Sequence, residues 1–448
     1  MGLLTLPTEL LLTIAKHMKS QGDIDSFVRT SRRLWTVINH YLYHFNIVDH
    51  RGIGIIRAAE NNQPVSVQYF IDAGIRKVEH WDRVPMLVAS ESGHDSVLRT
   101  LLEAGAAPDF GILQCCKLKI PLINACSGGH ENAVNLLLQY GVDVDLSTSV
   151  QAQSPLHAAA YFGHESIVRT LIQHGADIEA YTRGLIGEGR PLHFAVMGGE
   201  PDVFRALVDL GATVDISLLH CTAQYDYAWE CVKAILETGI DVNCRDDEFR
   251  TPLHCAAMNS AADVARILIQ QGAEIEARDR FLSTPLHHSV SRDNWKVVKI
   301  LLKLGRADVH ARNSKGNTPL HLVTEVTEHE DLDEKIETVK LLVAKGASIE
   351  SENRQRETPL FSAIRNKEVV TASLLIEMGA NIEHRNVRGD TPIYSALRTQ
   401  SAPIIELLLA KGCRTNIQNK RGDTPLIVSS KQNVATDRFF CAMMNAQH

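Results

Sequence analysis

Residues 154–178 read SPLHAAAYFGHESIVRTLIQHGADI, and this stretch contains the whole pattern of a two-helix repeat. Ser154 can cap a helix whose first turn contains Pro155, a place where proline loses no hydrogen bond. Three alanines follow, and they let the helix approach its neighbours closely. Gly163-His164 then forms a short break between this helix and a second helix, which has an apolar face. That helix ends at Gly175, because glycine adopts the left-handed conformation at the least cost.

The same pattern recurs along the chain. Ten of the fifteen prolines lie in the Pro155 context, which we call the slot, and Gly54 and Leu218 occupy a slot without proline. Successive slots are 31 to 36 residues apart, except for one step of 27 residues and one of 40 residues. A second signal is a glycine that falls 20 residues after most slots. These marker glycines are Gly74, Gly105, Gly141, Gly175, Gly211, Gly239, Gly272, Gly305, Gly346, Gly379 and Gly412.

This pattern resembles the ankyrin family, which repeats every 33 residues or so. The resemblance rests on blocks such as Ser154–Ala159 and Gly175–Ile178 and covers roughly nine-tenths of the chain. It implies an all-α ankyrin-repeat solenoid of paired helices with β-hairpin fingers over residues 49–448. We count about twelve units, of which the first and last are degenerate, as end caps often are. In this family the histidine after Pro-Leu bridges neighbouring units, which here concerns His157, His193, His254, His287 and His321.

Two steps depart from the period. The 27-residue step from Pro191 to Leu218 leaves too few residues for the usual finger, so we expect a missing or stunted finger there. The 40-residue step after Pro319 contains the acidic stretch 328–334, which we interpret as a solvated loop between two helices.

Residues 4–45 do not fit the repeat. Leu6-Pro7 leads into Glu9-Leu10-Leu11, and Leu10, Leu11 and Ile14 lie on one helical face. Further along come Asp23-Ile24, Phe27 and Thr30-Ser31-Arg32. This order resembles an F-box, and an F-box before ankyrin repeats resembles the arrangement of filamentous-fungal F-box/ankyrin proteins.

The F-box resemblance implies a small three-helix domain over residues 1–48 that binds the Skp-type adaptor of a cullin–RING ubiquitin ligase. The contact residues that it implies are Leu6, Pro7, Leu10, Leu11, Ile14, Ile24 and Phe27. The alternative is that these helices only cap the first ankyrin unit.

Composition and motifs argue against several other classes of protein. The net charge of −7 gives no reason to expect nucleic acid as a partner, and no apolar run approaches the roughly 18 residues that span a membrane. Nine cysteines without a glycosylation sequon favour a reducing compartment, the cytoplasm or the nucleus. Histidines and cysteines lack metal-ligand spacing, and Gly184–Gly189 reads as a finger rather than a phosphate loop. We therefore expect a monomer with no catalytic site, metal or cofactor.

In ankyrin proteins, partners usually contact the finger tips and the inner helices. The corresponding large residues are Trp81, Tyr161, Phe162, Met197, Phe249, Met258 and Phe281, and Phe249 stands where the family usually has glycine. In the last units the same positions are basic: Arg354, Arg365, Arg388, Arg398, Lys420 and Arg421. Glu357, Asp390 and Asp423 interleave with them, so this face is either a solvated mixed surface or a site for an acidic peptide.

The sequence thus predicts a protein–protein interaction scaffold that recruits substrates, of unknown identity, to an SCF-type cullin–RING ligase. The alternative is a plain ankyrin adaptor without a link to ubiquitin.

Overall fold

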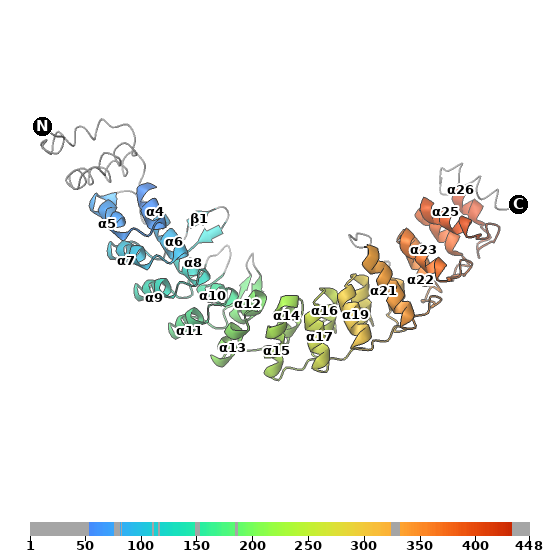
Figure 1. Ribbon diagram of the computed structural model, residues 1–448, viewed down its shortest axis with the longest axis horizontal. Helices are drawn as coiled ribbons and strands as arrows, with labels where there is room; N and C mark the ends of the chain where they lie inside the picture. The colour runs from blue at the N-terminus through green and yellow to red at the C-terminus, as the bar shows by residue number, and fades with distance from the viewer. Residues whose placement is uncertain are drawn as a thin grey trace, which may run out of the picture. The chain divides into compact units, whose positions relative to one another are not determined.

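The computed structural model describes residues 53–75, 81, 83–109, 112–114, 117–147, 153–183, 187–323 and 332–431. Within these residues the chain forms pairs of short antiparallel helices that follow one another in sequence order (Figure 1). The chain divides into two compact units, residues 1–213 and 214–448, and each is described here by itself.

In the first unit, the first helix of each pair packs on the first helix of the next pair, and the second helices pack in the same way. We call these the inner and the outer helices. The five pairs among the described residues of this unit are α4 (Ile53–Glu60) and α5 (Pro64–Asp72), α6 (Arg83–Ser92) and α7 (Asp95–Glu103), α8 (Pro121–Ser127) and α9 (Glu131–Gln139), α10 (Pro155–Tyr161) and α11 (Glu165–Gln173), and α12 (Pro191–Gly198) and α13 (Pro201–Asp209).

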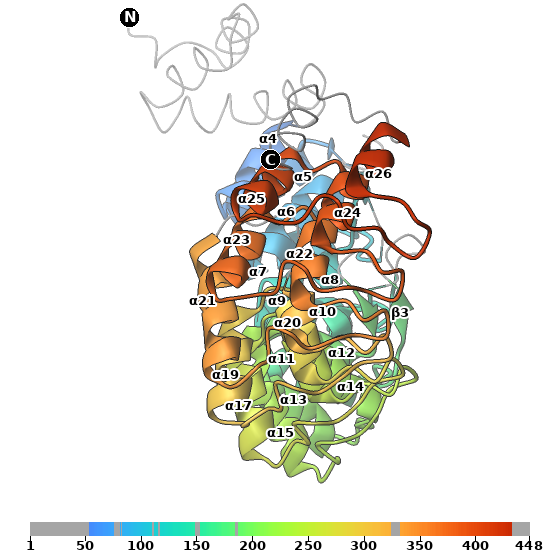
Figure 2. The ribbon, with the colours of Figure 1, turned by 90° about the vertical axis from the view of Figure 1, so that its right-hand side faces the viewer.

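The second unit repeats this arrangement, with the outer helices on one side, the inner helices beside them, and the connecting loops beyond (Figure 2). A short 3-10 helix, η3 (Asp226–Ala228), precedes α15. The helices are α14 (Ile216–Thr222) and α15 (Trp229–Glu237), α16 (Pro252–Met258) and α17 (Ala262–Gln270), α18 (Pro285–Ser291) and α19 (Trp295–Lys303), α20 (Pro319–Leu322) and α21 (Leu332–Ala344), α22 (Pro359–Arg365) and α23 (Val369–Glu377), α24 (Pro392–Thr399) and α25 (Ala402–Ala410), and α26 (Pro425–Lys431).

The slot prolines act as the sequence predicts. Pro155 and Pro252 each occupy the first turn of an inner helix, and the preceding Ser154 and Thr251 form capping boxes with the histidine three residues on. Pro64, Pro201 and Pro403 lie in the first turn of outer helices, which was also expected. The leucine that follows the slot proline is fully buried, as Leu156 and Leu253 illustrate, so the repeat core forms around the slot.

The fingers differ from the expected hairpins. Strands occur in only two fingers of the described residues. One pairs β1 (Ile112–Gln114) with β2 (Lys117–Lys119), and the other pairs β3 (Thr182–Arg183) with β4 (Glu188–Gly189), both antiparallel. In the glycine-rich segment, Gly187 precedes β4 and Gly189 belongs to it, so the described part of that segment lies in a finger. In the second unit the fingers are tight turns instead.

The 27-residue step lacks a finger, as predicted. Helix α13 ends at Asp209 and α14 begins at Ile216, with no strand or finger turn between them. The carboxylate of Asp215 caps α14 by accepting the Leu218 backbone N–H at 3.1 Å.

The loop interpretation of the acidic stretch 328–334 is wrong for its last three residues. Residues 324–331 lie outside the described part. Leu332, Asp333 and Glu334 already belong to α21, whose first turn contains both acids. Carboxylates at a helix N-terminus interact favourably with its dipole, which is the physical reason for helix here rather than loop.

Ten of the eleven marker glycines have positive φ, between +78° and +102°, and a Cβ added to any of them would meet no atom within 4 Å. The conformation alone therefore favours glycine at these helix ends. Gly305 is the exception, and the expectation of a left-handed residue there is wrong. Arg306 adopts the left-handed conformation instead, with φ of +54°. The physical reason is the extra residue Arg306 itself, which lies between Gly305 and Ala307, whereas Gly272 directly precedes Ala273.

This correction yields a paired prediction. We expect Gly305→Val to destabilise the protein by about 1 kcal/mol or more, because its Cβ would lie 2.8 Å from the Leu301 carbonyl oxygen. We expect Arg306→Gly to stabilise the protein by about 1 kcal/mol, because glycine adopts the left-handed conformation of this position without the steric cost that arginine has. Urea unfolding followed by circular dichroism measures both effects. Stabilisation by Gly305→Val, or destabilisation by Arg306→Gly, would contradict this assignment.

Candidate protein-binding surface

Six fingers of the second unit share one design. Each begins with an Asp or Asn whose side-chain oxygen accepts the backbone N–H groups two and four residues further on; for Asp279 these come from Phe281 and Ser283, both at 2.8 Å. Such local side-chain acceptors are the reason that Asp and Asn favour turns. The first residues of the six fingers are Asp246, Asp279, Asn313, Asn353, Asn386 and Asn419. We call the six together the finger platform.

The fourth residue of each platform finger has positive φ. Glycine occupies this place in three fingers, as at Gly389, whereas Phe249, Leu282 and Arg356 occupy it in the others. The prediction that Phe249 stands at a glycine position is therefore confirmed. A large residue in the left-handed region is unusual and strained, and such strain often accompanies functional positions.

Backbone hydrogen bonds join consecutive platform fingers. The second residue of each finger donates its N–H to the carbonyl of the third residue of the preceding finger. Arg280 thus donates to Glu248 at 3.0 Å, and Ser314 donates to Phe281 at 2.7 Å. The series continues with Arg354 to Lys315 at 3.1 Å, Val387 to Gln355 at 2.9 Å and Lys420 to Arg388 at 3.0 Å. The platform is therefore one hydrogen-bonded surface.

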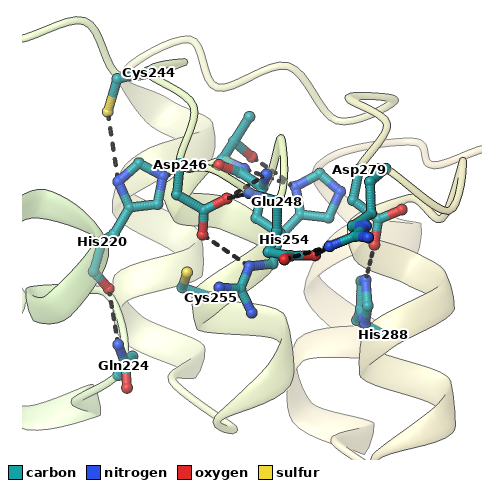
Figure 3. A network of polar contacts seen from close by, with 12 residues as sticks. His220, Gln224, Cys244, Asp246, Glu248, His254, Cys255, Asp279 and His288 are labelled. Atoms are coloured by element: carbon teal, nitrogen blue, oxygen red, sulfur yellow. Dashed lines mark hydrogen bonds and ion pairs between the residues drawn. The ribbon is translucent and has the colours of Figure 1, made fainter. Parts of the chain in front are cut away.

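Buried histidines connect several of the inner helices to the fingers beside them. The Nδ1 atom of His254, which Figure 3 labels, accepts the Thr251 backbone N–H at 3.0 Å. Its Nε2 donates to the Ser283 carbonyl at 3.1 Å in the next finger. His287 and His321 bridge to Asn317 and Glu357 in the same way, and His157 bridges to Gly189. The predicted bridging role of these four histidines is confirmed.

This bonding requires a neutral imidazole ring, since one nitrogen accepts and the other donates. Burial disfavours the charged ring and lowers the pKa of His157, His254, His287 and His321 to about 4. For His321, the Arg312 charge lowers the pKa further.

Three of the predicted contact residues are exposed aromatics. Phe249 and Phe281, on adjacent platform fingers, are 57% and 55% exposed, and Phe162 at the end of α10 is also exposed. The Arg280 guanidinium lies 5.1 Å from the centre of the Phe281 ring and supports it from one side. Exposed aromatics on a rigid scaffold are typical anchors for a partner.

The other apolar residues that were proposed as contacts are half-buried. Tyr161 packs edge-to-face against Phe162 and Phe194. A Cβ added to Gly187 would lie 2.4 Å from the Met197 methyl group, so Met197 lies against its own finger. Trp81 and Met258 are likewise partly covered. These residues offer a partner less surface than the three exposed phenylalanines.

The predicted basic residues surround a cavity of about 430 Å³ in the last repeats. Arg365 of α22, Arg388 of a finger and Arg398 of α24 all line it. Arg354, Lys420 and Arg421 are exposed on the fingers nearby. The structure therefore brings three of the six predicted cations together in one place.

Two of the three acids among these cations are buried rather than part of a solvated face, which corrects the interpretation for Glu357 and Asp390. Asp390 is fully buried and Glu357 nearly so. Arg398 donates to Asp390 at 2.5 Å, and Arg365 forms an ion pair with Glu357. Asn419 and Asn386 from the following fingers also donate to these two carboxylates. Arg365 and Arg398 are thus held in place by buried carboxylates, whereas Arg388 is exposed.

A second cavity, of about 300 Å³, lies beside α14, where the finger is missing. Its lining includes Ile216, His220 and Cys221 of α14, and Asp247 and Arg250 of the first platform finger. His220, labelled in Figure 3, connects the two elements, because its Nε2 lies 2.8 Å from the Arg250 carbonyl oxygen. Sequence reasoning missed this cavity, although the short step from Pro191 to Leu218 was a signal for it.

The predicted adaptor contacts, Leu6, Pro7, Leu10, Leu11, Ile14, Ile24 and Phe27, lie outside the described residues. Within the described residues, no cluster of three or more histidine, cysteine or acidic side chains could hold a metal ion. The same part of the chain contains no helix that is both long and apolar enough to cross a membrane.

Comparison with known proteins identifies the class of protein. A model of the ankyrin repeats in three copies matches residues 108–182, 192–279 and 330–419, which together exceed half of the chain. A second ankyrin model, for many copies, matches residues 268–323. The chain belongs to the ankyrin repeat family and is a helical solenoid that serves as a scaffold for protein–protein interaction.

Individual relatives are distant. Neurogenic locus notch homolog protein 1 of Homo sapiens is 30% identical over 145 residues, which is 32% of this chain but only 5% of the relative. The Mus musculus protein is 30% identical over 143 residues, with the same coverage. The chain thus spans about one-twentieth of the length of these relatives.

Solved structures show the same kind of similarity. The ankyrin repeat domain of Bcl-3, a member of the IkappaB protein family, is 26% identical with a TM-score of 0.42; the match covers 50% of this chain and 97% of that domain. The human ASB11 ankyrin repeat domain is 24% identical with a TM-score of 0.44; the match covers 51% of this chain and 99% of that domain.

Proposed function

We propose that this ankyrin protein is the substrate-recruiting subunit of a cullin–RING ubiquitin ligase of the SCF type. Residues 1–48 would bind the Skp-type adaptor, and the repeats in residues 49–448 would select a protein substrate. The support for the adaptor is the motif that runs from Leu6-Pro7 to Thr30-Ser31-Arg32. Such a ligase subunit acts in the cytoplasm or the nucleus, as a monomer within the larger complex.

The support for substrate selection is the finger platform. Phe249 and Phe281 stand out from a surface whose fingers are fixed to one another by backbone hydrogen bonds. Rigid presentation lowers the entropy cost of binding, so a few anchors can supply most of the affinity. Arg388, which is exposed at the larger cavity, favours an acidic segment of the substrate, whereas Arg365 and Arg398 there are paired with Glu357 and Asp390.

The adaptor assignment predicts the result of a pull-down. We expect Leu10→Ala with Leu11→Ala to lower the binding of a purified Skp-type adaptor to the full chain at least tenfold, because the double change removes two apolar contacts. The matched control is Val65→Ala with Tyr140→Ala, which truncates two exposed apolar residues of the ankyrin repeats.

Circular dichroism of both variants checks that the repeats stay folded. Binding of the adaptor at full strength by the Leu10/Leu11 variant would contradict the assignment. The chain would then be a plain ankyrin adaptor whose N-terminal helices cap the first repeat.

A further inference from the structure

The first finger of the platform has an open edge. The other five fingers use the N–H of their second residue to bond the preceding finger, from Arg280 onward. In the first finger the equivalent residue is Asp247. The repeat before it lacks a finger, and the Asp247 N–H donates to no acceptor in the part of the chain that the structure describes. The platform therefore ends on an unpaired donor with the geometry of a finger-to-finger bond.

The side chain of Asp247 is also unpaired. It is exposed, whereas the neighbouring Asp246 carboxylate binds the Arg250 guanidinium at 2.8 Å (Figure 3 labels Asp246). The cavity beside α14 is lined by all three residues, so its charged groups carry one negative charge in excess. Ile216, which is 50% exposed, adds an apolar wall. A cation on an aliphatic stem matches both features.

We propose that an extended segment of a partner protein docks in the place of the missing finger. One of its backbone carbonyls accepts the Asp247 N–H, as a finger would, and a lysine or arginine side chain enters the cavity and pairs with the Asp247 carboxylate. The stem of that side chain packs along Ile216. Addition of an extended segment to an exposed edge is a general mode of peptide recognition, in which main-chain bonds give affinity and side-chain cavities give specificity. This inference rests on the proposed role of the platform in substrate selection.

The test uses the full chain and capped heptapeptide libraries. Six positions are degenerate, without Pro or Cys, and the central residue is fixed as Arg, Lys, Leu or Glu. We expect the immobilised chain to retain the Arg and Lys libraries about fivefold more than the Glu library, since one exposed charge pair is worth up to about 1 kcal/mol. Equal retention of the four libraries, or retention of none, would overturn the proposal.

Two variants separate the contribution of the Asp247 carboxylate from that of the Asp247 backbone N–H. Asp247→Asn keeps the N–H but removes the charge, so retention of the Arg and Lys libraries falls to that of the Leu library. Asp247→Pro also removes the N–H and abolishes retention of all four. Asp333→Asn, which removes an exposed carboxylate from α21, changes nothing. If Asp247→Asn retains the Arg library as the unaltered chain does, the assigned carboxylate is wrong.

Hydrogen exchange in the free chain tests whether the edge is open. We expect the Asp247 amide to exchange quickly and to be slowed by the Arg library. Protection without peptide would overturn the proposal. It would mean that residues of the same chain occupy the edge, or a second copy if protection rises with protein concentration. Adaptor pull-down with each Asp247 variant stays unchanged, so failure here is distinguishable from failure of the ligase assignment.

Discussion

Acidification from pH 7 to pH 5 is expected to destabilise the repeats by about 2 kcal/mol for each buried bridging histidine. His157, His254, His287 and His321 are neutral in the folded chain, where burial lowers the pKa to about 4, against an ordinary value of 6.5. Below pH 6.5 the unfolded chain therefore binds protons that the folded chain does not. The stabilisation is complete above pH 6.5 and is lost as the pH falls toward 4.

The measurement is urea unfolding, followed by circular dichroism, at intervals between pH 7 and pH 4.5. His287→Asn should lower stability at pH 7 but reduce the slope with pH by about one proton, since one titrating group is removed. His310→Asn is the matched control, because it replaces an exposed histidine that makes no bridge between the described repeats. A midpoint that does not move between pH 6.5 and 4.5 would contradict the neutral bridging role.

Removal of the Arg398 guanidinium is expected to cost about 3 kcal/mol, because it leaves the fully buried Asp390 carboxylate without its charged partner. Asn419 still donates to Asp390 at 2.8 Å, which sets the value at the lower end of the range for such pairs. Arg388→Ala is the matched control. It removes an exposed arginine that lines the same cavity, and its cost should stay below about 0.5 kcal/mol.

Urea unfolding of Arg398→Ala and Arg388→Ala gives the comparison directly. Adding Asp390→Asn to Arg398→Ala should recover part of the loss, because the unpaired charge is then absent. Equal, small effects of the two single changes would show that the ion pair does not stabilise the repeats. The role of platform charge in partner binding should accordingly be tested with Arg388→Ala, because this substitution is expected to leave the fold intact.

The repeat register could be predicted from the sequence because its signals are local. A capping residue, a proline in the first turn and a glycine at the end each act within a few residues, and each recurs with the period. The absence of a finger before α14 followed from simple counting of residues. That Phe249 stands where the family usually has glycine followed from its place in the finger. The adaptor motif is also a sequence pattern, and it stays a prediction.

The tertiary structure decided which surface residues are free to bind. Arg388 and Arg398 look equivalent in the sequence, yet Arg398 is held by a buried carboxylate and Arg388 is not. Asp247 resembles every other second residue of a finger, but it alone among the described platform fingers has no preceding finger to bond. The physical reason is that burial and pairing depend on contacts with the next repeat, some 30 residues away in the sequence. No pattern within one repeat encodes those contacts.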